Sequence, residues 1–188
     1  MYNIKQRSFK KTKLNLLLES PQSLFHTKDL VLLWGIKNKN TLYTSIKRYI
    51  KRGVLISIHK GFYSKLPLNQ LDPIKLGISF LHSFAYLSTE TILTHHGIIS
   101  QSIPHISLIS DRSKRFKINN NHYISRQMQD KFLFNDRGII KKDGIGQATI
   151  ERAVADMLYY NPHYHFDAPN LINWKKVKEI QKIIGFKA

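Results

Sequence analysis

The stretch NKNTLYTSIKRYIKRGVLISIHKGFYS, residues 38–64, decides the fold of the N-terminal region. Its first half begins with Asn38, a good helix N-cap, and reaches Gly53, which favours the end of a helix. The apolar residues that recur there at the spacing of one helix face are Leu42, Ile46, Tyr49 and Ile50. Two short apolar runs follow, separated by a turn that ends in glycine, which is typical of a β-hairpin. The stretch therefore predicts a helix over residues 38–52 and a hairpin over residues 54–64.

Two shorter helices are predicted upstream of this stretch. The first covers residues 14–19 and ends before Pro21, because proline cannot continue a helix. The second covers residues 28–34, with Thr27 as its expected N-cap and Gly35 at its C-terminal turn. The resulting order of three helices and a hairpin predicts a winged helix-turn-helix domain over residues 1–66.

The outward face of the helix predicted at residues 38–52 carries cations and no acid. The residues opposite its apolar stripe are Lys39, Asn40, Tyr43, Thr44, Lys47, Arg48 and Lys51. In a helix-turn-helix the second helix lies in the major groove, where its outer side chains meet base edges and phosphates. A solvated, lysine-rich face on an ordinary helical bundle is the alternative interpretation. The neighbouring short capped helix, glycine turn and hairpin favour binding to double-stranded DNA.

Position along this helix predicts different roles for its residues. The residues near its N-terminal end, where side chains usually reach bases, are Asn40, Tyr43 and Thr44. Arg48 and Lys51 lie further along, where contacts to phosphate are expected. His59 and Lys60, at the hairpin tip, are expected to reach the flanking backbone or minor groove, as a wing does.

The charge of the chain is strongly basic and unevenly distributed. The formal net charge is +18, and residues 1–66 contribute +12 of it, with 14 Lys and Arg against two acids. Such a field attracts phosphate backbones. A composition rich in Lys, Asn and Ile, as an AT-biased genome produces, is an alternative source of the excess. There are no cysteines, the basic N-terminal stretch has no apolar run of the length expected in a signal peptide, and no run of about 18 uncharged apolar residues occurs. We therefore expect a cytoplasmic protein without a membrane partner.

Residues 67–188 predict a second, α+β domain of helices around a small antiparallel sheet. The expected helices start at Asp72-Pro73, at Ser88, at Thr149 and at Asn173, and end near residues 82, 95–97, 160 and 184. The expected strands are HISLIS, RFKI and HYISRQ, at residues 105–110, 115–118 and 122–127. Trp174 is expected to point inward in the last helix.

Candidate metal ligands and catalytic acids are few. His95-His96 and His163-x-His165 lack a matching acid or cysteine, so no metal site or cofactor is expected. The acids that a nuclease would use are Glu90, Asp111, Glu151 and Asp156. Asp156 is better explained by pairing with Arg152 at i, i+4, and Glu90 by the helix dipole. The run at residues 111–115 is expected to be a charged hairpin turn. We therefore expect a binding protein and no catalytic residue.

Several short motifs resemble one known family. They are residues 51–55, KRGVL; residues 59–63, HKGFY; residues 85–88, AYLS; and residues 150–153, IERA, with Asp156. In this order the chain resembles the AbiEi antitoxins of type IV toxin-antitoxin systems. The resemblance implies a winged helix that binds inverted repeats in its own promoter and represses its own operon, and a C-terminal antitoxin domain. It also implies a functional partner, a nucleotidyltransferase-like toxin, that is counteracted without a stable complex.

Two other functions remain open at this point. A stand-alone winged-helix regulator would use its second domain to sense a ligand or to dimerise, and a neighbouring nucleotidyltransferase gene would separate it from an antitoxin. A metal-dependent nuclease would use Asp111 and Glu90, and a cleavage assay with magnesium or manganese would reveal it.

Overall fold

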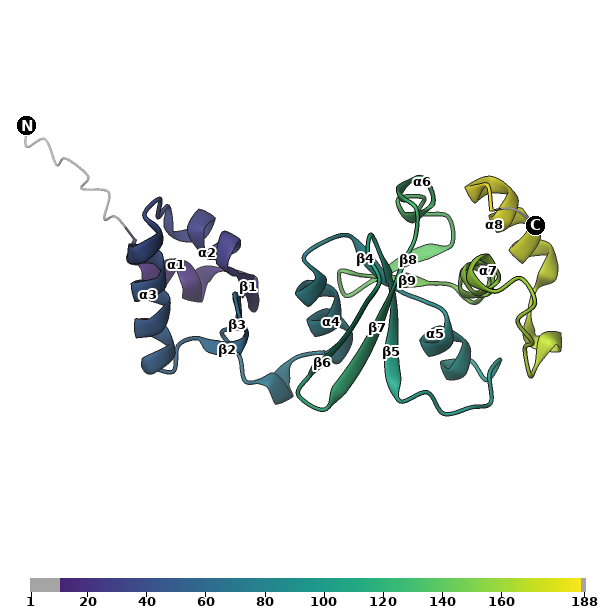
Figure 1. Cartoon of the computed structure of the whole chain (residues 1–188), viewed down its shortest axis with the longest axis horizontal. Coiled ribbons are helices and arrows are strands. Elements are labelled where there is room, and N and C mark those ends of the chain that lie inside the picture. Colours follow the sequence, from purple (N-terminus) through teal and green to yellow (C-terminus); the bar gives the residue numbers. More distant parts are fainter. Residues whose placement is uncertain (1–10, 187–188) are drawn as a thin grey trace, which may run out of the picture. The chain divides into compact units, whose positions relative to one another are not determined.

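The chain is a mixed α+β protein whose computed structural model describes residues 11–186 (Figure 1). Within these residues there are eight α-helices, two short 3-10 helices and two sheets. The chain divides into two compact units between Gln70 and Leu71, four residues beyond the boundary expected from sequence. The first ten residues, which belong to the expected DNA-binding domain, lie outside the described residues.

The first unit consists of three short helices and a small three-stranded sheet, followed by a 3-10 helix. Its elements are α1 (Lys13–Glu19), β1 (Leu24–His26), α2 (Thr27–Trp34), α3 (Lys39–Lys51), β2 (Ile56–His59), β3 (Phe62–Ser64) and the 3-10 helix η1 (Leu68–Gln70). The helices and the hairpin agree with the sequence prediction, but β1 was not predicted. This strand joins β3 antiparallel, with Leu24 opposite Ser64, and gives a sheet of order β1-β3-β2. Three residues are too few to show an alternating pattern, so only pairing across the fold identifies the strand.

The start of α2 differs from the prediction that Thr27 is its N-cap. His26 holds that position, and its N–H donates to the Asp29 carboxylate at 2.7 Å. Thr27 is the first helical residue, and its N–H donates to the carbonyl of Gly61 at 2.9 Å. The prediction was wrong because β1 runs directly into α2 and ties Thr27 to the hairpin turn.

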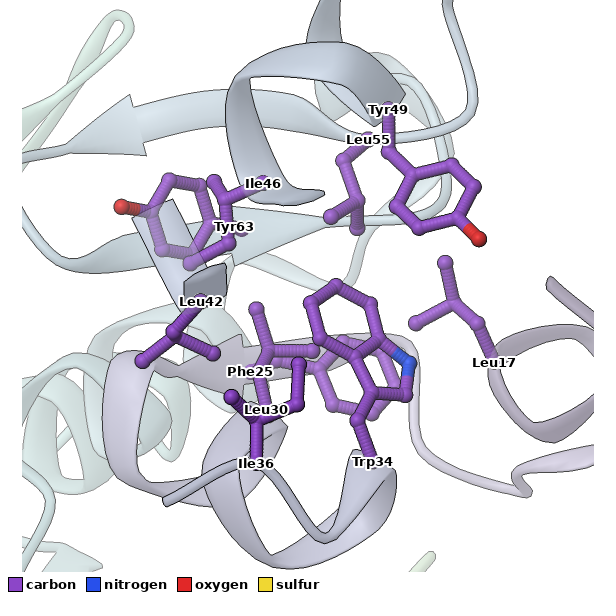
Figure 2. Close-up of a cluster of buried hydrophobic side chains, with 10 residues drawn as sticks. All are labelled: Leu17, Phe25, Leu30, Trp34, Ile36, Leu42, Ile46, Tyr49, Leu55 and Tyr63. Atoms are coloured by element: carbon purple, nitrogen blue, oxygen red, sulfur yellow. The ribbon is translucent and has the colours of Figure 1, made fainter. Parts of the chain in front are cut away.

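A single apolar cluster holds the first unit together (Figure 2). Its buried members are Leu17, Phe25, Leu30, Trp34, Ile36, Leu42, Ile46, Tyr49, Leu55 and Tyr63. The Trp34 and Tyr49 rings lie 5.4 Å apart, and the indole N–H of Trp34 donates to the carbonyl of Lys13 at 3.1 Å. Each of the three helices therefore contributes to one core, which fixes the face that α3 turns to solvent.

The second unit is built on a six-stranded sheet of order β6-β7-β5-β4-β9-β8. Its strands are β4 (Ala85–Leu87), β5 (His105–Ser110), β6 (Lys114–Ile118), β7 (Asn121–Gln127), β8 (Ile139–Lys142) and β9 (Ile145–Ala148). Its helices are α4 (Pro73–Leu81), α5 (Glu90–His95), α6 (Asp130–Leu133), α7 (Ile150–Tyr160), η2 (Pro169–Leu171) and α8 (Trp174–Ile184). In Figure 1, α4 lies on one side of the sheet, and α5 and α7 lie on the other.

The sheet is mixed, so the prediction of an antiparallel sheet was wrong. β5 pairs with β7 in parallel, and β4 pairs with β9 in parallel. The cause is that β7 inserts between β5 and β6, so residues 111–113 connect two strands that are not neighbours. The hairpin instead joins β6 and β7 around Asn119, whose φ of 52° asparagine tolerates well. The prediction of a hairpin turn at residues 111–115 was therefore also wrong.

Two further details of the second unit correct the sequence analysis. Ser88 does not cap α5, because Thr89 holds the N-cap position and the Ser88 hydroxyl donates to Asp156 at 2.7 Å. Trp174 does not point inward: it is 40% exposed, and its indole N–H donates to the carbonyl of Pro169. No helix in the described part of the chain is long and apolar enough to cross a membrane.

Candidate nucleic-acid interface

Helix α3 is fixed at both ends by its own sequence. The side chain of Asn38 accepts a hydrogen bond from the N–H of Thr41 at 3.0 Å, which satisfies one of the free donors of the first turn. The helix ends at Arg52, and Gly53 follows with a φ of 69°, a conformation that glycine adopts at little cost. Thirteen residues, or about 20 Å of helix at 1.5 Å per residue, therefore lie between two defined ends.

The two faces of α3 differ completely in character. The buried face consists of Leu42, Ser45, Ile46 and Tyr49. All seven residues predicted to point outward are exposed: Lys39, Asn40, Tyr43, Thr44, Lys47, Arg48 and Lys51. We call these seven residues the α3 outer face. It offers four cationic and three uncharged polar side chains, and no acceptor of formal negative charge.

The acids of the first unit lie elsewhere. Glu19 pairs with Lys11, and Asp29 accepts from the backbone at the start of α2. Among residues 11–186 no cation of α3 forms an ion pair. The positive charge of the α3 outer face is therefore not neutralised by the described protein, which leaves it able to attract phosphates.

The tip of the hairpin is also exposed and basic. His59 and Lys60 are exposed, and Gly61 completes the turn with a φ of 80°. The hydroxyl of Thr27 donates to the carbonyl of Gly61 at 3.3 Å, in addition to the bond from its N–H. These two hydrogen bonds attach the hairpin turn to the start of α2. They therefore hold the turn that carries His59 and Lys60 in a fixed position on the first unit.

In the second unit, residues from two distant motifs meet in a buried polar network. Arg152 Nε donates to Asp156 Oδ1 at 2.8 Å, and both side chains are fully buried. The hydroxyls of Tyr86 and Ser88 donate to Asp156 Oδ2 at 3.1 and 2.7 Å. Burial raises the pKa of Asp156, while Arg152 and the two hydroxyls oppose that rise. The predicted Arg152–Asp156 pair is confirmed, but its burial was not predicted.

Arg152 also binds the backbone that follows α6. Its Nη1 donates to the carbonyls of Asn135 and Arg137 at 2.9 and 2.8 Å, and its Nη2 to Tyr86 Oη at 2.8 Å. One guanidinium therefore holds together β4, α7 and the loop before β8. Because the side chains of Arg152 and Asp156 are fully buried, the pair is part of the interior of this unit.

The acids that a nuclease would recruit are each engaged by a cation. Glu90 lies in the first turn of α5, where the helix dipole was expected to explain it. It also pairs with Arg126 and accepts from Ser107 Oγ, so the dipole accounts for only part of its interactions. Burial alone would raise the pKa of Glu90, but Arg126 and several hydrogen bonds lower it below its ordinary value. Hydrogen bonds from Arg112 and Ser83 lower the pKa of Asp111 to about 2.

The remaining candidate metal ligands do not form a cluster. No group of three His, Cys, Asp or Glu side chains able to hold a metal ion occurs in residues 11–186. The rings of His95 and His96 lie 5.1 Å apart, without a third ligand in that part of the chain.

No protein-family model matches the sequence, and no curated protein matches it. The geometry of α3 is therefore the feature that bears most directly on function.

Proposed function

We propose that the first unit is a winged helix that binds double-stranded DNA, with α3 as the recognition helix and the β2–β3 hairpin as the wing. The observation that carries this proposal is the exposed α3 outer face, with four cations and no acid. The element order, helix, strand, helix, helix, strand, strand, and the sheet order β1-β3-β2 support the same assignment.

The chemistry of the α3 outer face suits both kinds of contact that a major-groove helix makes. A major groove about 12 Å wide admits one α-helix, and amide and hydroxyl side chains recognise base edges there. Asn40, Tyr43 and Thr44 occupy the first turns of α3. Lys47, Arg48 and Lys51 follow in the second half, where they supply charge to phosphates without reading sequence.

We further propose that the protein represses its own operon and is the antitoxin of a type IV system, opposed to a nucleotidyltransferase-like toxin. The motifs shared with AbiEi antitoxins support this role. Tyr86, Ser88, Arg152 and Asp156, which belong to two of those motifs, form the buried network of the second unit. If this chain shares its fold with the AbiEi antitoxins, the shared motifs should include residues that hold the core together, as these four do.

Two groups of α3 variants test the DNA-binding role by titration of the protein's own promoter and a random duplex at 50 and 200 mM salt. Asn40→Ala, Tyr43→Ala and Thr44→Ala are expected to reduce the difference in affinity between the promoter and the random duplex. Each lost base contact is expected to cost about 1–3 kcal/mol of binding free energy. The phosphate-group variants, Lys47→Ala, Arg48→Ala and Lys51→Ala, are expected to weaken both DNAs alike and lower the salt slope by about one unit each.

Lys75→Ala is the matched control, because this exposed lysine of α4 carries the same charge in the second unit. It is expected to bind both DNAs like the parent protein. If all six α3 variants keep the parent's thermal melt and still bind both DNAs as the parent does, α3 is not the recognition helix.

The antitoxin role is tested separately by co-expression with the product of the adjacent gene. If that product is a toxin that arrests growth, an antitoxin must restore growth.

A further inference from the structure

One face of the sheet in the second unit carries a basic hollow. Side chains alternate between the two faces of a strand. Phe116 and Tyr123 stack together, with ring centroids 4.8 Å apart, and face α4, where Phe116 meets Phe80. The opposite face presents His105 of β5, Arg115 and Lys117 of β6, and His122, Ile124 and Arg126 of β7. We call these six residues the basic sheet face.

The strand register places the members of this face side by side. Lys117 lies opposite His122, and His122 lies opposite His105 on the next strand. Arg115 lies opposite Ile124. A hollow of about 590 Å³ is lined by five of these residues, His105, Arg115, Lys117, His122 and Ile124, and also by Pro104, Phe116 and Tyr123. A second hollow of about 330 Å³ shares Arg115 and Ile124 and extends to Arg126. The two adjoin along β6 and β7.

The hollow is positively charged. Three of the four Lys and Arg of strands β5, β6 and β7 lie on the basic sheet face, namely Arg115, Lys117 and Arg126, and these strands contain no acid. Arg115 and Lys117 are exposed, and neither forms an ion pair within residues 11–186. Glu90 forms its ion pair with Arg126 and also accepts from Ser107 Oγ, so it holds the Arg126 guanidinium against the sheet. Two cations at the rim are therefore available to an anionic ligand.

Protection of the sheet edge explains only part of this pattern. β6 is an edge strand, and charged side chains on such strands prevent pairing with other chains. His122, however, is exposed on β7, which has neighbours on both sides. An inner strand needs no such protection, so a ligand accounts for the whole face better than edge protection does.

We propose that the basic sheet face binds single-stranded RNA. The hollow places the rings of His105 and His122 beside the cations Arg115 and Lys117, and this combination of stacking rings and charge suits unpaired nucleotides, whose bases are free to stack, better than a duplex. Arg115 and Lys117 are two residues apart on β6, or about 6.7 Å, which is close to the spacing of successive phosphates. Histidine rings and arginine planes stack on unpaired bases, and the open backbone edge of β6 can meet 2′-hydroxyls. Burial lowers the pKa of His105; Glu90 opposes this shift, and the nearby Arg126 and Arg115 add to it.

The experiment uses the full chain and a fluorescein-labelled, unstructured 12-nucleotide RNA, with excess unlabelled random duplex DNA to occupy the α3 outer face. The test variant is Arg115→Gln/Lys117→Gln. The matched control is Lys141→Gln/Lys142→Gln, which removes the same charge from exposed residues of β8, at the opposite edge of the same sheet. The test variant is expected to lose about tenfold in RNA affinity and about 1.4 units of salt slope, at 0.7 per phosphate contact. The control is expected to match the parent.

His122→Ala provides a second, independent variant. Loss of one base-stacking ring is expected to weaken RNA binding about fivefold without changing the salt slope. Ultraviolet cross-links from 4-thiouridine in the RNA are expected at residues 104–126. Thermal melts of all variants serve as the folding control. The substituted side chains are exposed, so the melting temperatures are expected to stay close to that of the parent.

Three results would overturn the proposal. Equal losses in the test and control variants would mean that only total charge matters. Displacement of the RNA by duplex DNA would place its binding on the α3 outer face. Equal binding of a single-stranded DNA of the same sequence would contradict the choice of RNA. The proposal concerns a different unit from the proposed DNA reader, so α3 variants that fail to bind duplex leave it intact.

Discussion

Replacement of Arg152 by methionine is expected to destabilise the second unit severely. Methionine retains much of the side-chain length but none of the donors. The change leaves Asp156 buried without its cation, and it removes the donors to the carbonyls of Asn135 and Arg137. Removal of one partner from a buried ion pair costs about 3–5 kcal/mol. Part of that cost comes from carbonyl groups left without a hydrogen bond, at about 1–3 kcal/mol each.

Hydrogen exchange followed by mass spectrometry measures this loss separately in each unit. Amides of β4 and α7 are expected to exchange on the order of 100- to 4,000-fold faster in the variant, which is the same cost expressed as an opening equilibrium. Amides of α3 are expected to be unchanged, because the first unit has its own core.

Arg137→Met is the matched control. Arg137 pairs with Glu179 at 3.8 Å, and both side chains are more than half exposed. Exposed pairs of this kind contribute less than about 1 kcal/mol, so the control is expected to exchange nearly as the parent does. If Arg152→Met exchanged like Arg137→Met, the network would contribute little to stability, and the structural role given to the two motifs would be wrong.

Two further changes test the packing and electrostatics of the second unit. Gly77→Ala is expected to destabilise it by about 1–3 kcal/mol in a denaturant titration, because the new Cβ would overlap the buried Tyr123 ring. A Gly77→Ala variant as stable as the parent would show that this ring moves aside. The pKa of Glu90 is lowered in the folded state, so its contribution is present above about pH 4.5 and disappears as pH falls through the folded value. Melting temperatures between pH 6 and 3 are therefore expected to fall less steeply in Glu90→Gln than in the parent; parallel curves would refute the Glu90–Arg126 coupling.

Most helices were predictable because their determinants are local, although the N-caps of α2 and α5 and the four-residue helix α6 were not. Asn38, Asp72 and Thr149 each accept a hydrogen bond from the N–H three residues later, as the sequence pattern indicates. The exposure of the α3 outer face followed from the position of Leu42 and Ile46 alone, since a helix has a fixed period. The candidate DNA interface was therefore largely accessible from sequence.

Strand partners and buried networks depended on contacts that no local pattern contains. The alternation in β5, β6 and β7 identified three strands, but nothing in it indicated that β7 lies between the other two. The basic sheet face follows from that order, and the sequence analysis did not group its residues. Arg152 and Tyr86 are likewise 66 positions apart, so their hydrogen bond required the fold.

The placement of the acids bears on how a chain of net charge +18 would recognise a particular DNA sequence, as proposed above. Asp29 and Asp72 accept from backbone N–H groups at helix starts, and Glu90 and Asp156 pair with arginines inside the second unit. Because these acids serve the fold, most Lys and Arg side chains of residues 11–186 form no ion pair, and in the proposed function they would accelerate association with any nucleic acid. Charge of this kind gives affinity without sequence preference. If composition alone explained the excess, own-promoter and random DNA would bind equally well, whereas uncharged residues such as Asn40 that read bases would separate the two at every salt concentration.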